Sequence, residues 1–306
     1  MMIHPSAMVH ESAVLGEGVE IGPFAVVGPR VKIGNGCRLA AHAIVHRDCE
    51  LDEQVFVDSF VVIGGDAQMR EARPESEQAR VVVGARCVLR EGVTIHRSAE
   101  QVGVTEVGPD GYLMSNSHVA HDCVVGEFAT LANNAMLAGY VKLGAHTFVG
   151  GGAGVHQFVR VGQSAMIAGN AAISYDVPPF CVAVDRNDII GLNRVGLRRR
   201  GFDREAMSDL KDCFRTVFRG SGNLRSDAQA ALAAGACGST APGREFLEFF
   251  VAGGKRGFGQ ARKLRRGGDS EAGVASEASL RQPRGDNAEC GRIDRGDDAA
   301  AERADP

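Results

Sequence analysis

The stretch from residue 119 to residue 143 reads Val-Ala-His-Asp-Cys-Val-Val-Gly-Glu-Phe-Ala-Thr-Leu-Ala-Asn-Asn-Ala-Met-Leu-Ala-Gly-Tyr-Val-Lys-Leu. An aliphatic residue stands at every sixth position, at Val119, Val125, Leu131, Leu137 and Leu143. The residue four positions after each of the first four aliphatic residues is a cysteine, an alanine or a valine. A six-residue unit of strand and corner cannot bury its aliphatic side chain alone, but stacked units line these side chains into one column. The stretch therefore predicts a parallel β-helix of hexapeptide repeats.

The same period runs far beyond this stretch. From Ile3 to Ile63, and again from Val83 to Ile173, every sixth residue is aliphatic except Gln101. The pattern resembles the left-handed parallel β-helix, which has three short strands in each coil of 18 residues, and we assign it to residues 1–190. The period fails at about 64–82 and about 97–106, which predicts two expelled loops where binding residues often lie.

The C-terminal part has a different pattern. Between 191 and 263 we expect a small α-helical domain, with Asp203 as the N-cap of an amphipathic helix. Ser226 has capping-box spacing to Gln229 before an alanine-rich stretch, and Glu245–Val251 is expected to form a third helix. Residues 264–306 contain almost no large apolar side chain, so we expect a disordered tail.

Composition excludes several classes of protein. The chain has 306 residues and a net charge of −4, which does not suggest a dedicated nucleic-acid binder. No run approaches the roughly 18 apolar residues of a membrane span, so we expect a cytoplasmic protein without stable membrane insertion. The repeat places Cys37, Cys49, Cys87 and Cys123 at the small interior position, which favours buried packing over metal or redox chemistry.

A coil of 18 residues also predicts which residues stack. His121 should lie under Gly139 and then Gln157, while Ala120, Ala138 and His156 form the neighbouring column. His121 and His156 are therefore expected on one face. At a corner, His121 can act as a general base that the adjacent Asp122 orients, and Gly139 can offer its N–H to a developing oxyanion.

A zinc site is the alternative chemistry for this stretch. His118 and His121 could supply two ligands, but the repeat directs Cys123 inward and no third ligand stands out. A catalytic zinc needs three protein ligands and one open position. We therefore expect no metal.

Six longer motifs carry a family resemblance. They are Ile95-His-Arg97, His118-Val-Ala-His-Asp-Cys123, Leu131-Ala-Asn-Asn-Ala-Met-Leu-Ala-Gly139, Val155-His-Gln-Phe158, Asp176-Val-Pro-Pro-Phe180 and Gly191-Leu-Asn-Arg-Val-Gly-Leu-Arg-Arg-Arg-Gly-Phe202. From residue 3 to about 260 the chain resembles the UDP-N-acetylglucosamine O-acyltransferases of lipid A biosynthesis. The resemblance implies a homotrimer with active sites between subunits. It also implies transfer of a 3-hydroxyacyl chain from acyl carrier protein to the sugar 3-hydroxyl, with no other cofactor.

The resemblance also implies roles for individual residues. His121 would be the general base, Asp122 its orienting partner and Gly139 the oxyanion donor. Residues that would contact the nucleotide sugar or the acyl chain are Gln68, His118, His156, Gln157, Asn193, Arg199 and Gly169, the last where the family sets acyl length.

The chain departs from the family pattern at four positions. Tyr140 replaces a common histidine, Met69 and Glu71 alter the first loop, and Val195 replaces a glutamate of some members. These changes leave open a different UDP-sugar acceptor, acylated on an amine, and a scaffold that binds nucleotide sugar or acyl carrier protein without turnover. A zinc enzyme similar to γ-carbonic anhydrase is a further alternative.

Overall fold

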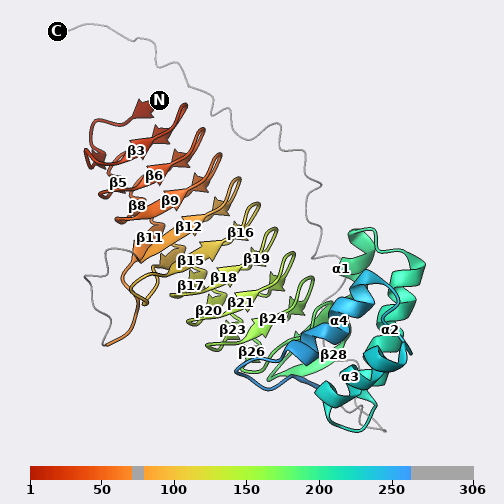
Figure 1. The fold of residues 1–306 in the computed structure, drawn as a ribbon. Helices are drawn as coiled ribbons and strands as arrows, with labels where there is room; N and C mark the ends of the chain where they lie inside the picture. The colour runs from red at the N-terminus through yellow and green to blue at the C-terminus, as the bar shows by residue number, and fades with distance from the viewer. Residues whose placement is uncertain (71–78, 263–306) are drawn as a thin grey trace, which may run out of the picture. The chain divides into compact units, whose positions relative to one another are not determined.

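The computed structural model describes residues 1–70 and 79–262. These residues form a stack of coils with four helices at its C-terminal end (Figure 1). The predicted left-handed parallel β-helix with C-terminal helices is confirmed. The expected tail at 264–306 and the middle of the first loop, including Glu71, lie outside the described residues.

Each coil contributes one short strand to each of three sheets. Within the described residues, sheet A has twelve strands, sheet B nine and sheet C eight, and every pairing is parallel except β27 with β28. Sheet A contains β1 (Met2–Ile3), β4 (Glu20–Ile21), β7 (Arg38–Leu39), β10 (Phe56–Val57), β13 (Val88–Leu89), β16 (Tyr112–Leu113), β19 (Thr130–Leu131), β22 (Phe148–Val149), β25 (Met166–Ile167), β27 (Cys181–Val184), β28 (Asp188–Leu192) and β29 (Gln260–Ala261). Sheet B contains β2 (Met8–Val9), β5 (Val26–Val27), β8 (Ile44–Val45), β11 (Val62–Gly65), β14 (Thr94–His96), β17 (His118–Val119), β20 (Met136–Leu137), β23 (Gly154–Val155) and β26 (Ala172–Ile173). Sheet C contains β3 (Val14–Leu15), β6 (Lys32–Ile33), β9 (Cys49–Leu51), β12 (Arg80–Val83), β15 (Val104–Val107), β18 (Val124–Val125), β21 (Lys142–Leu143) and β24 (Arg160–Val161).

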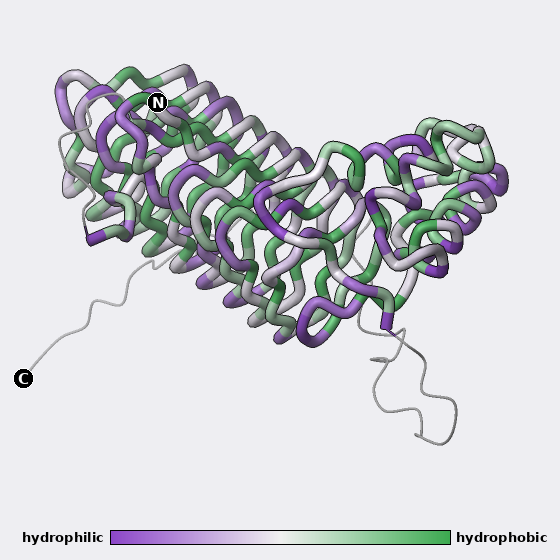
Figure 2. Tube along the Cα trace, turned by 60° about the horizontal axis from the view of Figure 1, so that its bottom comes forward, coloured by the Kyte–Doolittle hydropathy of each residue, from purple (hydrophilic) through white to green (hydrophobic). Residues whose placement is uncertain are grey.

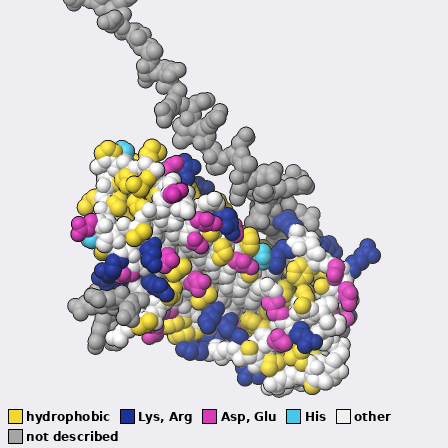
Figure 3. Space-filling model, turned by 45° about the horizontal axis from the view of Figure 1, so that its top comes forward, with side chains coloured by type: hydrophobic (Ala, Val, Ile, Leu, Met, Phe, Trp, Pro, Cys, Tyr) yellow, Lys and Arg dark blue, Asp and Glu magenta, His cyan; other side chains and the backbone are white. Residues whose placement is uncertain are grey.

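The core is the column of aliphatic residues that the period predicts. From Ile21 onward these side chains are buried, and the four cysteines of the repeat lie among them. Hydrophobic and hydrophilic segments alternate around the coils (Figure 2). The first coil differs, because Ile3 is 39% exposed and has a stacking neighbour on one side only. Apolar side chains gather on this N-terminal end, whereas acidic and basic side chains are interspersed along the stack (Figure 3).

Tight turns form the three edges of the stack. Along the edge between sheets B and C, the turns place Asp122, Tyr140 and Phe158 above one another, each with a φ near +60°. Few residue types other than glycine adopt this left-handed conformation readily, although aspartate tolerates it well. Side chains of this column therefore project from the edge in register, and we call it the catalytic edge.

The helical part contains α1 (Arg194–Arg199), α2 (Arg204–Phe218), α3 (Leu224–Ala234) and α4 (Ala241–Ala252). Asp203 caps α2 as predicted, accepting a hydrogen bond from the Ala206 N–H at 2.7 Å. The expected cap at Ser226 is wrong, since Asn223 caps α3 and Ser226 lies inside the helix. α4 begins four residues before the predicted Glu245, because Thr240 caps it. Among the described helices, none is long and apolar enough to cross a membrane.

After α4 the chain returns to the β-helix. We call residues 253–258 the return segment. Its Gly257 carbonyl accepts a hydrogen bond from the Asp176 N–H at 2.7 Å, and β29 then pairs with β28. The return segment therefore lies against the final coils, with Arg256 bound to the Gln157 carbonyl on the catalytic edge.

Candidate active site

His121 and Asp122 form a hydrogen-bonded pair in the turn after β17. The His121 Nδ1 lies 2.8 Å from Asp122 Oδ2, and only 8% of His121 is exposed. A carboxylate accepts hydrogen bonds, so His121 carries its proton on Nδ1 and keeps the Nε2 lone pair. The predicted corner position is confirmed, and the pair has the arrangement of a base with its orienting partner.

The second expelled loop holds Asp122 in place. Ser98 donates its hydroxyl hydrogen bond to Asp122 Oδ1, and the Ala99 N–H donates to Oδ2 at 3.0 Å. The Asp122 N–H in turn donates to Thr105 Oγ1 at 2.8 Å. These three residues were not predicted as functional. The break in period at Gln101 indicates the loop, but not its contacts.

Gly139 lies directly against the imidazole, as the 18-residue stacking predicts. A Cβ at this position would come within 2.6 Å of His121 Cε1 and Nε2, so no side chain fits beside the ring. Its N–H makes no hydrogen bond within residues 1–70 and 79–262. A free amide next to a base is suited to stabilising an oxyanion.

A cavity of about 550 Å³ opens beside this pair on the outer face of sheet B. Five predicted residues line it, namely Gln68, His118, His121, Gly139 and His156. Ala120, Ala138, Gly154 and Ala172 also line the cavity, and their small size leaves space for a ligand. The cavity brings together residues that are far apart in the sequence.

His118 is an uncharged member of this cavity near neutral pH. Burial, together with charge repulsion from nearby His96 and His121, lowers the pKa of His118 to about 4. Its Nδ1 lies 2.8 Å from Thr94 Oγ1. His118 can therefore contact a substrate by hydrogen bonding but does not supply a positive charge.

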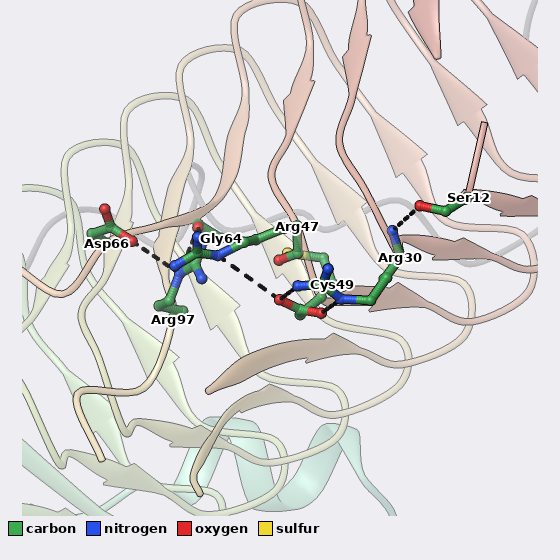
Figure 4. A network of polar contacts seen from close by, with 8 residues as sticks. Ser12, Arg30, Arg47, Cys49, Gly64, Asp66 and Arg97 are labelled. Carbon is green, nitrogen blue, oxygen red and sulfur yellow. Dashed lines mark hydrogen bonds and ion pairs between the residues drawn. The ribbon is translucent and has the colours of Figure 1, made fainter. Parts of the chain in front are cut away.

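The base of the first loop is fastened to the coil that follows it (Figure 4). The buried Arg97 donates to the Gly64 carbonyl from Nε at 3.2 Å and from Nη2 at 3.0 Å, and it pairs with Asp66 at 3.2 Å. His96 Nδ1 lies 2.6 Å from the Asp66 carbonyl oxygen. These contacts position the segment that places Gln68 at the cavity.

Tyr140 occupies the position where the resemblance implied a histidine. Its hydroxyl donates to Glu100 Oε1 at 2.7 Å, and its ring meets His121 edge-on with centroids 5.2 Å apart. Burial, followed by the hydrogen bond to Glu100, raises the pKa of Tyr140, so the phenol stays protonated. The ring stacks on Phe158 at 4.7 Å, over which Lys255 lies at 4.1 Å.

Four predicted substrate-binding residues lie outside this cavity in the single chain. Asn193 caps α1 and donates from Nδ2 to the Ser164 carbonyl at 3.0 Å, on the edge between sheets C and A. Arg199 is exposed in the last turn of α1, and Gln157 is exposed beside His156. Gly169 lies near Gly151 on the edge between sheets A and B. Their assigned roles stay predictions.

The described residues do not form a metal-binding cluster. No group of three or more His, Cys, Asp or Glu side chains is arranged there to hold an ion. Among the described residues, the zinc alternative therefore gains no third ligand beside His118 and His121.

Comparisons with known proteins agree with the motifs. A family model described as UDP-N-acetylglucosamine O-acyltransferase, domain 2, matches residues 176–258, and a bacterial transferase hexapeptide model matches residues 12–47. The acyl-[acyl-carrier-protein]–UDP-N-acetylglucosamine O-acyltransferase of Caulobacter vibrioides is 48% identical over 227 residues, covering 74% of this chain and 86% of that protein.

Solved structures of the same kind of enzyme also superpose on this chain. The UDP-N-acetylglucosamine acyltransferase of Campylobacter jejuni has a TM-score of 0.78 at 36% identity, covering 85% of this chain and 100% of the other. The Francisella novicida enzyme has a TM-score of 0.80 at 30% identity, with coverage of 86% and 95%. On its sequence and its fold together, this chain belongs to the family of UDP-N-acetylglucosamine O-acyltransferases.

Proposed function

We propose that this protein transfers a 3-hydroxyacyl chain from acyl carrier protein to the 3-hydroxyl of UDP-N-acetylglucosamine, the first step of lipid A biosynthesis. The proposal rests on the surroundings of the His121 imidazole. Its Nδ1–H is held by Asp122, its ring borders the cavity, and the free N–H of Gly139 lies beside it. The proposed place of the reaction is the cytoplasm.

The mechanism follows from these three groups. The sugar hydroxyl attacks the thioester carbonyl of the acyl donor while His121 Nε2 takes the hydroxyl proton. Asp122 stabilises the resulting imidazolium, and the Gly139 N–H stabilises the oxyanion. When the tetrahedral intermediate collapses, the C–S bond breaks and the leaving thiolate receives the proton from His121. The acyl donor is the only co-substrate, and no step requires a cofactor.

The arrangement of site residues supports a homotrimer. His121 lies on the catalytic edge, Asn193 is bound to the edge between sheets C and A, and Gly169 lies on the third edge. Residues on different edges of one stack can share a substrate only where the edges of neighbouring chains meet. A threefold assembly places such edges together, and sedimentation should give three times the 32.3 kDa chain mass.

The acceptor is tested by direct assay. Purified protein is given 3-hydroxyacyl carrier protein donors of several lengths with UDP-N-acetylglucosamine or with its 3-amino analogue. We expect ester formation with the natural sugar. Preference for the amine would identify a different acceptor, and absence of transfer to either sugar would favour a binding scaffold.

The base is tested by His121→Ala. We expect transfer to fall to background while the thermal unfolding midpoint changes little. His10→Ala, an exposed histidine in the first coils, provides the matched control. Substantial transfer by the His121 variant would refute the mechanism.

A further inference from the structure

The return segment contacts the catalytic edge through two basic residues. Arg256 donates from Nε to the Gln157 carbonyl at 2.9 Å, and its Nη2 lies 2.7 Å from His156 Nδ1. Lys255 lies next to it, over the ring of Phe158. His156 is thus held by a residue 100 positions away in the sequence.

Buried groups fix the return segment in this position. Asp176 has no exposed surface, and its backbone bonds to Gly257 at 2.7 Å and to Gly259 at 2.9 Å. Its carboxylate pairs with Arg160 at 2.8 Å. A Cβ on Gly254 would come within 2.7 Å of both side chains, so the segment packs tightly against this pair. Arg256 therefore approaches His156 from an anchored backbone.

The contact with Arg256 determines where His156 carries its proton. A guanidinium donates hydrogen bonds and cannot accept one, so His156 Nδ1 must be the acceptor. The other neighbour of Nδ1 is the Gln157 carbonyl, which is 3.4 Å away and already accepts from Arg256 Nε. The neutral imidazole of His156 consequently carries its hydrogen on Nε2.

His121 has the opposite tautomer, with its hydrogen on Nδ1 because Asp122 accepts there. Both imidazoles line the same cavity. One presents a proton acceptor at Nε2 and the other presents a hydrogen-bond donor. The two partners, a carboxylate and a guanidinium, thus assign opposite functions to two histidines.

We propose that Arg256 is a positioning residue that fixes His156 as an Nε2–H donor to an oxygen of the bound nucleotide sugar. The proposal rests on the proposed function in one respect, which is that His156 contacts this substrate. Arg256 does not line the cavity. Its effect on substrate binding should pass through the His156 imidazole, since its other hydrogen bond goes to the backbone carbonyl of Gln157.

The tautomer can be observed directly. In protein with ¹⁵N-labelled histidine, long-range ¹H–¹⁵N correlation spectra should show His156 with a protonated Nε2 and a bare Nδ1, assigned by His156→Gln. In Arg256→Met the two tautomers should mix, whereas Arg256→Lys should largely keep the native one. A protonated Nδ1 in the unaltered protein, or a spectrum unchanged in Arg256→Met, would overturn the proposal.

Kinetics test the consequence for substrate. Arg256→Met should raise KM for UDP-N-acetylglucosamine about tenfold, as expected for one hydrogen bond to a charged partner, with kcat nearly unchanged. Arg256→Lys should recover most of the loss. Arg215→Met, which removes a surface ion pair with Asp212, is the matched control and should leave KM unchanged.

A double variant separates this proposal from the proposed function. If Arg256 acts through His156, Arg256→Met should have no further effect on KM in a His156→Ala background. An equal effect in both backgrounds would overturn the proposal, as would a normal KM in His156→Ala. Absence of transfer by the unaltered protein would instead refute the proposed function, while the tautomer measured by NMR would still stand.

Discussion

Replacing Ser98 with alanine tests whether the second expelled loop sets the geometry of the base. The Ser98 hydroxyl is one of three donors to the Asp122 carboxylate, with the Ala99 N–H and the His121 Nδ1–H. Ser98 lies 23 residues before His121 and does not line the cavity. Ser98 Oγ also accepts the Glu100 N–H at 3.0 Å, so an effect on transfer passes through Asp122 or through the loop that holds it.

The size of the effect follows from the surroundings of Asp122. Its side chain is 9% exposed, so water can scarcely replace the lost donor. A hydrogen bond to a charged group contributes about 1.5 to 3 kcal/mol, which corresponds to about 10- to 160-fold in rate if fully expressed. Because two donors remain, we expect the lower end, a fall in kcat of about tenfold. KM should change little, since the loss affects the orientation of His121.

The assay measures kcat and KM with UDP-N-acetylglucosamine and a 3-hydroxyacyl carrier protein. Ser221→Ala is the matched control, because Ser221 donates a similar hydrogen bond to Asp227 at 2.7 Å in the helical part. Thermal unfolding of both variants reports any general loss of stability. A kcat for Ser98→Ala within about twofold of the unaltered value, or an equal loss in the control, would refute the role of the loop.

Three further predictions concern other parts of the chain. The pKa of His118 falls from 6.5 to about 4 on folding, so between these pH values the unfolded chain binds one proton more than the folded chain. The free energy of unfolding should therefore decrease as the pH falls from 6.5 to about 4. In His118→Asn this decrease should be less steep. Burial raises the pKa of Cys49 and Cys123 to about 12, and all seven described cysteines are buried. In a Cys290→Ser variant, a disulfide reagent at about pH 8 should therefore modify none of these seven until the protein is unfolded. Gly169→Met should shift the acyl preference toward shorter chains, and an unchanged chain-length profile would contradict the assignment of Gly169.

The repeat made most of the fold predictable. Each hexapeptide gives independent evidence for the same coil, and the coil length fixes which residues stack. For this reason the contact of His121 with Gly139 and the shared face of His121 and His156 follow from spacing alone. The first coil departs from the expected burial only because the stack ends there.

The partners of the catalytic groups could not be predicted in the same way. Ser98 and Ala99 reach Asp122 from a loop where the period is interrupted, and Arg256 reaches His156 from beyond the helical part. No periodicity relates these positions to the coils that they contact. The predicted N-cap at Ser226 was also wrong. The capping-box spacing at Ser226 is a local signal, and the helix instead begins after Asn223, three residues earlier.

A second aspartate shows why the repeat alone does not make an active site. Asp48 follows Val45 by three residues, as Asp122 follows Val119, and their φ angles are 60° and 59°. Both carboxylates project from the same edge, but Asp48 binds Arg30 at 2.7 and 2.9 Å, whereas Asp122 binds Ser98 and His121. At this position of the repeat, three residues after the buried aliphatic, an aspartate joins neighbouring coils when its partner is an arginine. It orients a base when its partner is a histidine beside an expelled loop. The backbone of the coil thus supplies a position, and the segments outside the repeat decide which coil becomes catalytic.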